Sequence, residues 1–231
     1  MLKLSKIKAV TLDLDDTLWP IRPTIENAEV ALQRWLLAHA PKTAHLSASA
    51  EVRHEIRSLV HSRHLDKLHD LSFLRRESIR ESLIRAGDEP QLAEPAFDVF
   101  FAARQNVSLY EGVQQALEKL SQRYPLVSIS NGNADVFSTS AAPYFKSAVS
   151  ARLVGVAKPD SRIFEAAAAS LNLPLDAILH LGDDASTDVM GARNAGMQTI
   201  WINTQNHAWT HESDAPLTVS QLLEVCDHVL T

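Results

Sequence analysis

The second half of the chain alternates between short apolar segments and segments with helical periodicity. The apolar segments are LVSIS (126–130), SAVSA (147–151), AILHLG (177–182) and QTIWI (198–202), and the helical patterns cover 112–121, 161–170 and 188–195. This order predicts a parallel sheet with helices on both faces, because parallel neighbours need long crossover connections that helices usually supply. We therefore expect an α/β fold with a doubly wound, Rossmann-like core.

One further apolar strand, residues 7–12, stands far from the others in the sequence. Between them lie four amphipathic helical patterns, at 24–40, 49–63, 70–86 and 91–103. A lone strand would leave its backbone groups unpaired, so it is expected to join the sheet, with the helices inserted as an all-helical module. The predicted domains are a core of residues 1–16 and 107–231 and a helical insertion of residues 17–106.

Composition limits the possible functions. The chain has 231 residues, of which 45% are hydrophobic, and this is enough for a large core. Its net charge of −6 comes from interspersed charges without a basic stripe, so nucleic acid is not an expected partner. No stretch approaches the roughly 18 apolar residues of a membrane span. The single cysteine, Cys226, suits a reducing cytoplasm, and no feature specifies an oligomeric state.

Polar residues gather where the predicted strands end. In chain order these residues are Asp13, Asp15, Asp16, Thr17, Ser130, Asn131, Gly132, Lys158, Asp183, Asp184 and Asp188. In open parallel sheets, ligands bind outside the carboxyl ends of the strands. Four such clusters on one rim predict a functional site there.

These residues carry a family resemblance. The segments DLDDT and GDDASTD, with Ser130 and Lys158 between them, resemble the four motifs of the haloacid dehalogenase superfamily, and the helical insertion resembles its C1 cap. The resemblance covers residues 1–16 and about 107–215. It implies a Mg²⁺-dependent phosphotransferase that works through an aspartyl-phosphate.

A narrower resemblance concerns the substrate. The segments SNGNAD, VGVAKPDSRIF and ILHLGDDASTDVMGARNAGMQTIWIN are similar to those of a bacterial subgroup that dephosphorylates flavin mononucleotide and 5-amino-6-(5-phosphoribitylamino)uracil. The resemblance implies a small phosphorylated metabolite of riboflavin metabolism as the substrate. Fold and motifs alone leave the leaving group open.

The residue types also support phosphoryl transfer without the resemblance. Asp13 would be ionised at neutral pH, and aspartate carboxylates act as covalent nucleophiles toward phosphorus. Asp15 lies two residues on, so both side chains fall on one side of the strand, and it can serve as general acid and then general base.

Cations and hydrogen-bond donors would complete this site. Mg²⁺ prefers hard oxygen ligands, and Asp13, the Asp15 backbone carbonyl and Asp183 would supply them. Either Asp184 or Asp188 would orient a metal-bound water. Lys158 would hold Asp13 ionised. The predicted donors to the phosphoryl group are Ser130, Asn131 and Gly132.

Residues next to these motifs also have predicted roles. Trp19 and Arg22 follow the first motif and would face the substrate's leaving group, although Trp19 could equally pack in a hinge. Asp16 and Thr17 are expected to form a turn and to orient neighbouring groups rather than to react, and His180 is expected to be buried with its hydrogen bonds satisfied.

Several alternative functions remain open from the sequence. They are a phosphatase for another small phosphate (phosphoglycolate, a sugar phosphate or a nucleotide), a phosphomutase, a dehalogenase and a non-catalytic scaffold. A dehalogenase would need neither the general acid Asp15 nor a Mg²⁺ cluster around Asp183. A scaffold would be expected to have lost the nucleophile or Lys158.

Overall fold

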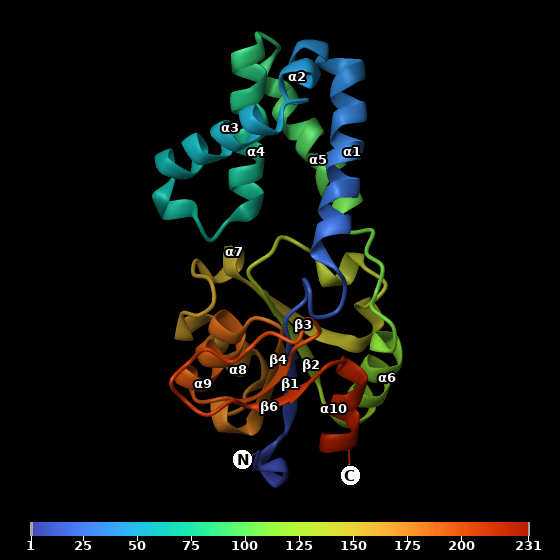
Figure 1. Cartoon of the computed structure of the whole chain (residues 1–231), viewed down its shortest axis with the longest axis vertical. Helices are drawn as coiled ribbons and strands as arrows, with labels where there is room; N and C mark the ends of the chain where they lie inside the picture. The colour runs from blue at the N-terminus through green and yellow to red at the C-terminus, as the bar shows by residue number, and fades with distance from the viewer. Residues whose placement is uncertain (1, 231) are drawn as a thin grey trace. The chain divides into compact units, whose positions relative to one another are not determined.

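The computed structural model describes residues 2–230, which divide into two compact units (Figure 1). One unit comprises the residues up to Pro20 and those from Ser108 onward, and the other comprises Ile21–Val107. The first unit therefore extends to Pro20, four residues beyond the predicted boundary at residue 16. Residues 17–20 belong to it because Leu18 and Trp19 are fully buried and the Leu18 carbonyl accepts a hydrogen bond from the Tyr110 amide at 2.9 Å.

The first unit, called the core unit below, contains a six-stranded parallel sheet with the order β3-β2-β1-β4-β5-β6. The strands are β1 (Ala9–Leu12), β2 (Leu126–Ser130), β3 (Phe145–Ser150), β4 (Ile178–Gly182), β5 (Gln198–Ile202) and β6 (Leu217–Val219). The predicted doubly wound α/β fold is confirmed. The first strand lies between β2 and β4, so residues that follow these three strands reach the same edge.

The central strands are buried along their whole length. Every residue of β1, β2 and β4 is buried, which is typical of parallel strands covered on both faces and explains their continuous apolar character. The covering helices are α6 (Val113–Arg123), α7 (Ala151–Val154), α8 (Ser161–Leu171), α9 (Gly191–Ala195) and α10 (Leu222–Val229). Helix α8 packs against α9, and α6 packs against α10, on opposite sides of the strands (Figure 1).

The second unit, called the helical unit below, consists of helices and short connecting turns. Its helices are α1 (Ile21–His39), α2 (Pro41–Leu46), α3 (Ala50–Arg63), α4 (Leu71–Ala86) and α5 (Ala93–Arg104). It therefore has one short helix, α2, more than the sequence predicts. The apolar faces of α1, α4 and α5 meet in a buried cluster around Leu32, Leu83 and Phe97.

Local signals set the ends of these helices. The Ser49 hydroxyl accepts a hydrogen bond from the Val52 amide at 3.3 Å at the start of α3. The Asp70 carboxylate does the same for Phe73 at 2.9 Å at the start of α4, which ends at Gly87 with φ of 75°. No helix among residues 2–230 combines the length and the apolar character needed to cross a lipid bilayer.

Candidate active site

The sheet brings three of the predicted site residues to one edge. Asp13 directly follows β1, and its backbone amide donates to the Leu181 carbonyl of β4 at 2.9 Å, which extends the pairing of the two strands. Ser130 ends β2 on one side of β1, and Asp183 follows β4 on the other. Asp13 therefore lies at the centre of this edge.

Lys158 lies among these residues, in the loop that precedes α8. Its ammonium group donates to Asp13, to Asp188 at 2.5 Å and to the Ile129 carbonyl at 3.0 Å, and its side chain is only 2% exposed. Burial alone would lower the pKa of Lys158, but the Asp13 and Asp188 carboxylates raise this pKa above its usual value. Lys158 therefore stays charged and binds both carboxylates.

The loop after β2 positions Lys158. The Asn131 side chain accepts from the Lys158 backbone amide at 2.7 Å and donates to its carbonyl at 3.0 Å. The Asn131 side chain thus orients the lysine, and the predicted donation from the Asn131 amide to a phosphoryl group stays a prediction. The Gly132 amide donates to the Ser130 hydroxyl at 2.9 Å, so the Ser130 oxygen accepts from the chain and its proton can still be donated.

Three carboxylates meet beside the lysine. Oxygen atoms of Asp13, Asp183 and Asp188 lie within 4.8 Å of one another. Thr17 links two of them, because its hydroxyl lies 2.9 Å from Asp183 and 3.4 Å from Asp13. These contacts fit the orienting role that the sequence predicted for Thr17.

When all three are ionised, the carboxylates carry more negative charge than Lys158 balances. Burial raises the pKa of Asp13, and burial together with the charge of Asp188 raises the pKa of Asp183 to about 7. Burial opposes ionisation of Asp188 too, but Lys158 and His180 outweigh it and lower its pKa to about 2. Clustered hard oxygen donors with unbalanced negative charge fit a divalent cation such as Mg²⁺.

Asp184 and Asp188 have different roles in the structure. The Asp184 side chain is exposed and accepts from the backbone amides of Ser186 at 2.8 Å and Thr187 at 2.6 Å, at the start of the π-helical turn Ala185–Met190. Asp188 is 1% exposed and faces the other carboxylates. Of the two candidates for orienting a metal-bound water, Asp188 is therefore the one placed to do so.

Two further residues support Asp188. His180 is buried, as predicted, and its Nε2 lies 3.2 Å from Asp188 while its Nδ1 lies 2.9 Å from the Thr11 hydroxyl. Burial lowers the pKa of His180, so Nε2 of the neutral ring donates to the ionised Asp188. At Gly182 a Cβ atom would lie 2.3 Å from the Asp188 Cγ, so only glycine fits there. Sequence reasoning missed this requirement because it depends on tertiary contact.

The turn after Asp13 holds Asp15. The Trp19 indole N–H donates to Asp15 Oδ1 at 2.8 Å, and the Asp16 amide donates to the Trp19 carbonyl at 2.8 Å, with Asp16 at φ of 60°. Trp19 is fully buried. Of the two alternatives for Trp19, this placement favours packing over a contact with the leaving group: the ring lies inside the protein, and its N–H holds the carboxylate that was predicted to be the general acid.

Arg22 lies in the helical unit, in the first turn of α1. Its side chain is 88% exposed, and its Nε donates to Glu26 at 2.9 Å. An exposed i,i+4 pair of this kind has little energetic weight. The predicted contact of Arg22 with a substrate stays a prediction.

Comparison with protein families identifies the class to which this site belongs. Residues 7–196 match the haloacid dehalogenase-like hydrolase family. The chain belongs to this family, and the resemblance found in its motifs is confirmed.

Curated relatives narrow the class to phosphatases. The chain is 34% identical over 207 residues to the 5-amino-6-(5-phospho-D-ribitylamino)uracil phosphatase YigB of Escherichia coli strain K12, covering 88% of this chain and 86% of the relative. It is 29% identical over 157 residues to the phosphoserine phosphatase of Thermus thermophilus, covering 65% of this chain and 63% of that one. The chain is an enzyme, a phosphatase of the haloacid dehalogenase superfamily.

Solved structures share the fold. A structure described as a 2-haloacid dehalogenase from Pseudomonas syringae pv. Tomato DC3000 is 38% identical, with a TM-score of 0.88 over 97% of this chain and 98% of that one. A phosphatase of the superfamily from Thermococcus onnurineus is 22% identical, with a TM-score of 0.68 over 96% and 98% of the two chains, and shows the fold alone.

Proposed function

We propose that this enzyme is a Mg²⁺-dependent phosphomonoesterase that forms a phosphoaspartate on Asp13 and acts on a small phosphorylated metabolite. The observation that carries the proposal is the grouping of Asp13, Lys158, Asp183 and Asp188 at the carboxyl edge of the sheet. A phosphate monoester repels an anionic nucleophile, so a carboxylate can attack only where cations balance the charge. One buried lysine and a metal-binding set of carboxylates meet this requirement.

In the first half-reaction, the Asp13 carboxylate attacks phosphorus. A bond forms between an Asp13 oxygen and phosphorus, and the bond from phosphorus to the leaving oxygen breaks. Asp15, protonated at this stage, gives its proton to the leaving alkoxide. Lys158 keeps Asp13 ionised and in place, and the Ser130 hydroxyl donates to the transferred phosphoryl group.

In the second half-reaction, water attacks the phosphoaspartate. Asp15, now ionised, takes a proton from the water as general base. The Asp13–phosphorus bond breaks, free phosphate leaves, and Asp13 regains its carboxylate. Trp19 holds Asp15 in position through both steps.

Asp13, Asp183 and the Asp15 backbone carbonyl would hold Mg²⁺, with Asp188 placed to orient a water on it. When bound, the ion would supply the positive charge that lets an anionic phosphate approach the carboxylates. We further propose that the helical unit acts as a cap that excludes bulk water and large polymers. The buried free Cys226 suits a reducing compartment such as the cytoplasm.

The proposed substrates are flavin mononucleotide or a ribitylaminopyrimidine phosphate of riboflavin metabolism. The similarity to YigB over most of both chains supports this choice. Phosphoglycolate, a sugar phosphate or a nucleotide are the alternatives. A screen of phosphate release across these compounds, compared by kcat/KM, tests the proposal, and a preference for one of the alternatives by tenfold or more would overturn it. Release of free phosphate would also exclude a phosphomutase.

The Asp13→Asn variant tests the nucleophile. We expect phosphate release to fall about a thousandfold or more, since a carboxamide cannot form the phosphoaspartate. The matched control is Asp176→Asn, an exposed aspartate paired with Lys6, which should retain full activity. Circular dichroism would show that both variants fold, and substantial turnover by the folded Asp13→Asn protein would remove the assignment.

The Trp19→Phe variant tests the positioning of Asp15. It keeps a buried ring but removes the N–H that donates to Asp15 Oδ1. We expect kcat to fall roughly tenfold for an alkyl phosphate, and less for p-nitrophenyl phosphate, whose leaving group needs no protonation. Trp209→Phe is the control, because that indole donates to the Ser213 carbonyl. Equal losses on both substrates would indicate a merely structural role.

Dehalogenation is the second candidate, favoured by the 38% identical structure described as a 2-haloacid dehalogenase. That reaction would also use Asp13 as nucleophile. It would need neither a general acid at Asp15, because halide leaves unprotonated, nor a metal-binding set of carboxylates at Asp183 and Asp188. Assays of chloride release from 2-chloropropionate and of phosphate release from p-nitrophenyl phosphate, each with Mg²⁺ or EDTA, separate the two. Chloride release that is insensitive to EDTA would favour the dehalogenase.

A further inference from the structure

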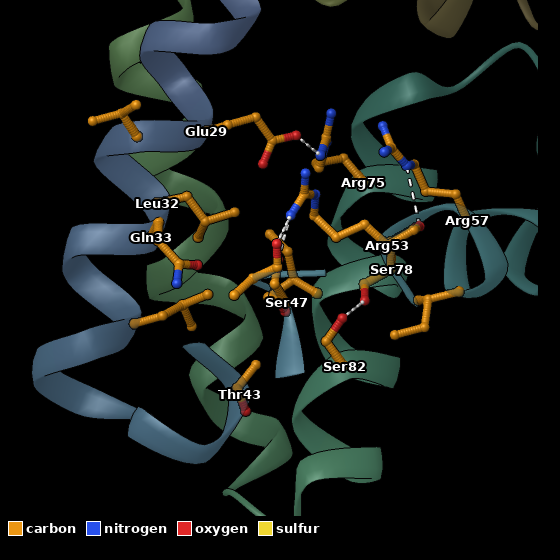
Figure 2. A pocket seen from close by; sticks show the side chains of 15 residues that line it. Glu29, Leu32, Gln33, Thr43, Ser47, Arg53, Arg57, Arg75, Ser78 and Ser82 are labelled. Carbon is orange, nitrogen blue, oxygen red and sulfur yellow. Dashed lines mark hydrogen bonds and ion pairs between the residues drawn. The ribbon is translucent and has the colours of Figure 1, made fainter. Parts of the chain in front are cut away.

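The helical unit contains a cavity of about 320 Å³ that none of the proposed catalytic residues lines (Figure 2). Its walls come from helices α1, α2, α3 and α4 and from the segment between α2 and α3. A space of this size can hold a small organic molecule.

Positive charge gathers at one end of the cavity. Figure 2 shows the guanidinium groups of Arg53, Arg57 and Arg75 together at this end, with the Glu29 carboxylate beside them. Glu29 is already paired with Arg75 at 2.6 Å. Among residues 2–230, no carboxylate forms an ion pair with Arg53 or Arg57. Three guanidinium groups thus share one carboxylate.

The two unpaired arginines are held in place by the backbone. Arg53 Nη1 donates to the carbonyls of Ser47 at 2.5 Å and Ala48 at 3.0 Å, and Arg57 Nε donates to the Arg53 carbonyl at 3.2 Å. Partial burial, then the charges of Arg75 and Arg53, lower the pKa of Arg57. Arg57 is exposed and its guanidinium stays protonated, so this end of the cavity carries an excess of positive charge that attracts an anion.

The rest of the cavity is mainly apolar, with a few polar atoms. Leu32, Leu36, Ile56 and Ile79 line it, and all four are buried. The hydroxyls of Ser78 and Ser82 donate to backbone carbonyls at 2.8 Å each, which leaves their lone pairs as acceptors for a ligand. An apolar body with a hydrogen-bond donor would fit this lining.

We propose that the cavity binds a small organic anion, with a carboxylate or phosphate group against Arg53 and Arg57 and an apolar body against Leu32 and Ile56. Guanidinium groups bind carboxylate and phosphate through paired hydrogen bonds, so an anion here would gain both charge balance and geometry. The proposal rests on the helical unit alone and stands independently of the phosphoaspartate mechanism.

Isothermal titration calorimetry with phenylphosphonate tests the site. This probe has an apolar ring, an anionic head and a carbon–phosphorus bond that a phosphomonoesterase cannot hydrolyse. We expect Arg57→Gln to weaken its binding about tenfold or more, because Arg57 lies at the rim and its loss should spare the fold. The matched control is Arg63→Gln on the same helix, an arginine outside the cavity that pairs with Glu81 at 3.0 Å, and its binding should match the wild type.

A second variant and two further probes complete the design. Ala48→Trp, at an exposed position of the rim, should block the cavity without changing its charge. Benzoate should bind, and the tighter of the two anions identifies the preferred head group, whereas neutral benzyl alcohol should bind at least tenfold more weakly. Phenylphosphonate binding to Asp13→Asn should still be sensitive to Arg57→Gln. Equal phenylphosphonate binding by the wild type, Arg57→Gln and Ala48→Trp would overturn the proposal, and so would equal affinity for benzyl alcohol.

Discussion

The core unit and the helical unit each gather charged side chains into one cluster, with an excess of opposite sign. At the edge of the sheet, three carboxylates meet one ammonium group. In the helical cavity, three guanidinium groups meet one carboxylate. The first arrangement favours a cation and the second an anion.

The two clusters differ in burial. Burial determines how much stability each unit loses when one partner of an ion pair is removed. Lys158 and Asp188 have side chains that are 2% exposed, whereas Arg75 and Glu29 are 18% and 29% exposed. An ion pair that water cannot screen is costly to break, because the remaining charge stays buried without a partner. Removing one partner should therefore destabilise the core unit more than the helical unit.

The largest effect is expected for Lys158→Met. The methionine has a similar length, but the change removes the one ammonium group that contacts Asp13 and Asp188 among residues 2–230. We expect the free energy of unfolding to fall by about 3–5 kcal/mol in EDTA, measured by urea denaturation. Lys146→Met, at an exposed position of β3, is the control and should change stability by less than about 0.5 kcal/mol. A similar loss of unfolding free energy in both variants would contradict the special contribution of the buried ion pairs.

A smaller effect of opposite sign is expected for Asp183→Asn. Burial and repulsion from Asp188 make the charge of Asp183 unfavourable without a metal. Its removal should therefore leave the protein in EDTA as stable as the wild type, or more stable by about 1 kcal/mol. Adding Mg²⁺ should raise the melting temperature of the wild type but not of this variant.

The neighbouring residue supplies the control for that experiment. Asp184→Asn changes a carboxylate that caps the π-helical turn, so it should lower stability slightly and keep the response to Mg²⁺. A loss of the Mg²⁺ response in Asp184→Asn with retention in Asp183→Asn would reverse the assignment of the metal ligands.

The sequence predicted most of the sheet because its signals are local. Buried parallel strands appear in the sequence as continuous apolar segments, and the polar residues that follow them mark where each strand ends. The elements that were missed are short: α2 has six residues, α7 four, β6 three and α10 eight. Pro41 directly follows the predicted helix 24–40, and in the structure it begins α2, because proline suits the first turn of a helix.

The site was predictable as a set of residues but not as a set of contacts. Asp184 and Asp188 are both acidic and four positions apart, and only the folded turn shows that one caps a helix while the other contacts Lys158. The direction of the Trp19 ring is likewise a tertiary property. The arginines of the helical cavity carry no motif, because three helical positions become neighbours only when α3 packs against α4.

The smallest effect is expected for Glu29→Gln in the helical unit. This change removes the only carboxylate among the cavity arginines and leaves Arg75 over the Phe100 ring at 4.3 Å. Because the pair is partly exposed, we expect a loss of about 1 kcal/mol by urea denaturation. Glu26→Gln, which breaks the exposed pair with Arg22 on the same helix, should cost less, about 0.3 kcal/mol.

Phenylphosphonate should bind Glu29→Gln more tightly than the wild type, since the variant lacks the carboxylate that competes for the arginines. Weaker binding of phenylphosphonate to Glu29→Gln would mean that Glu29 orders the arginines. It would contradict the inference that excess positive charge attracts the anion.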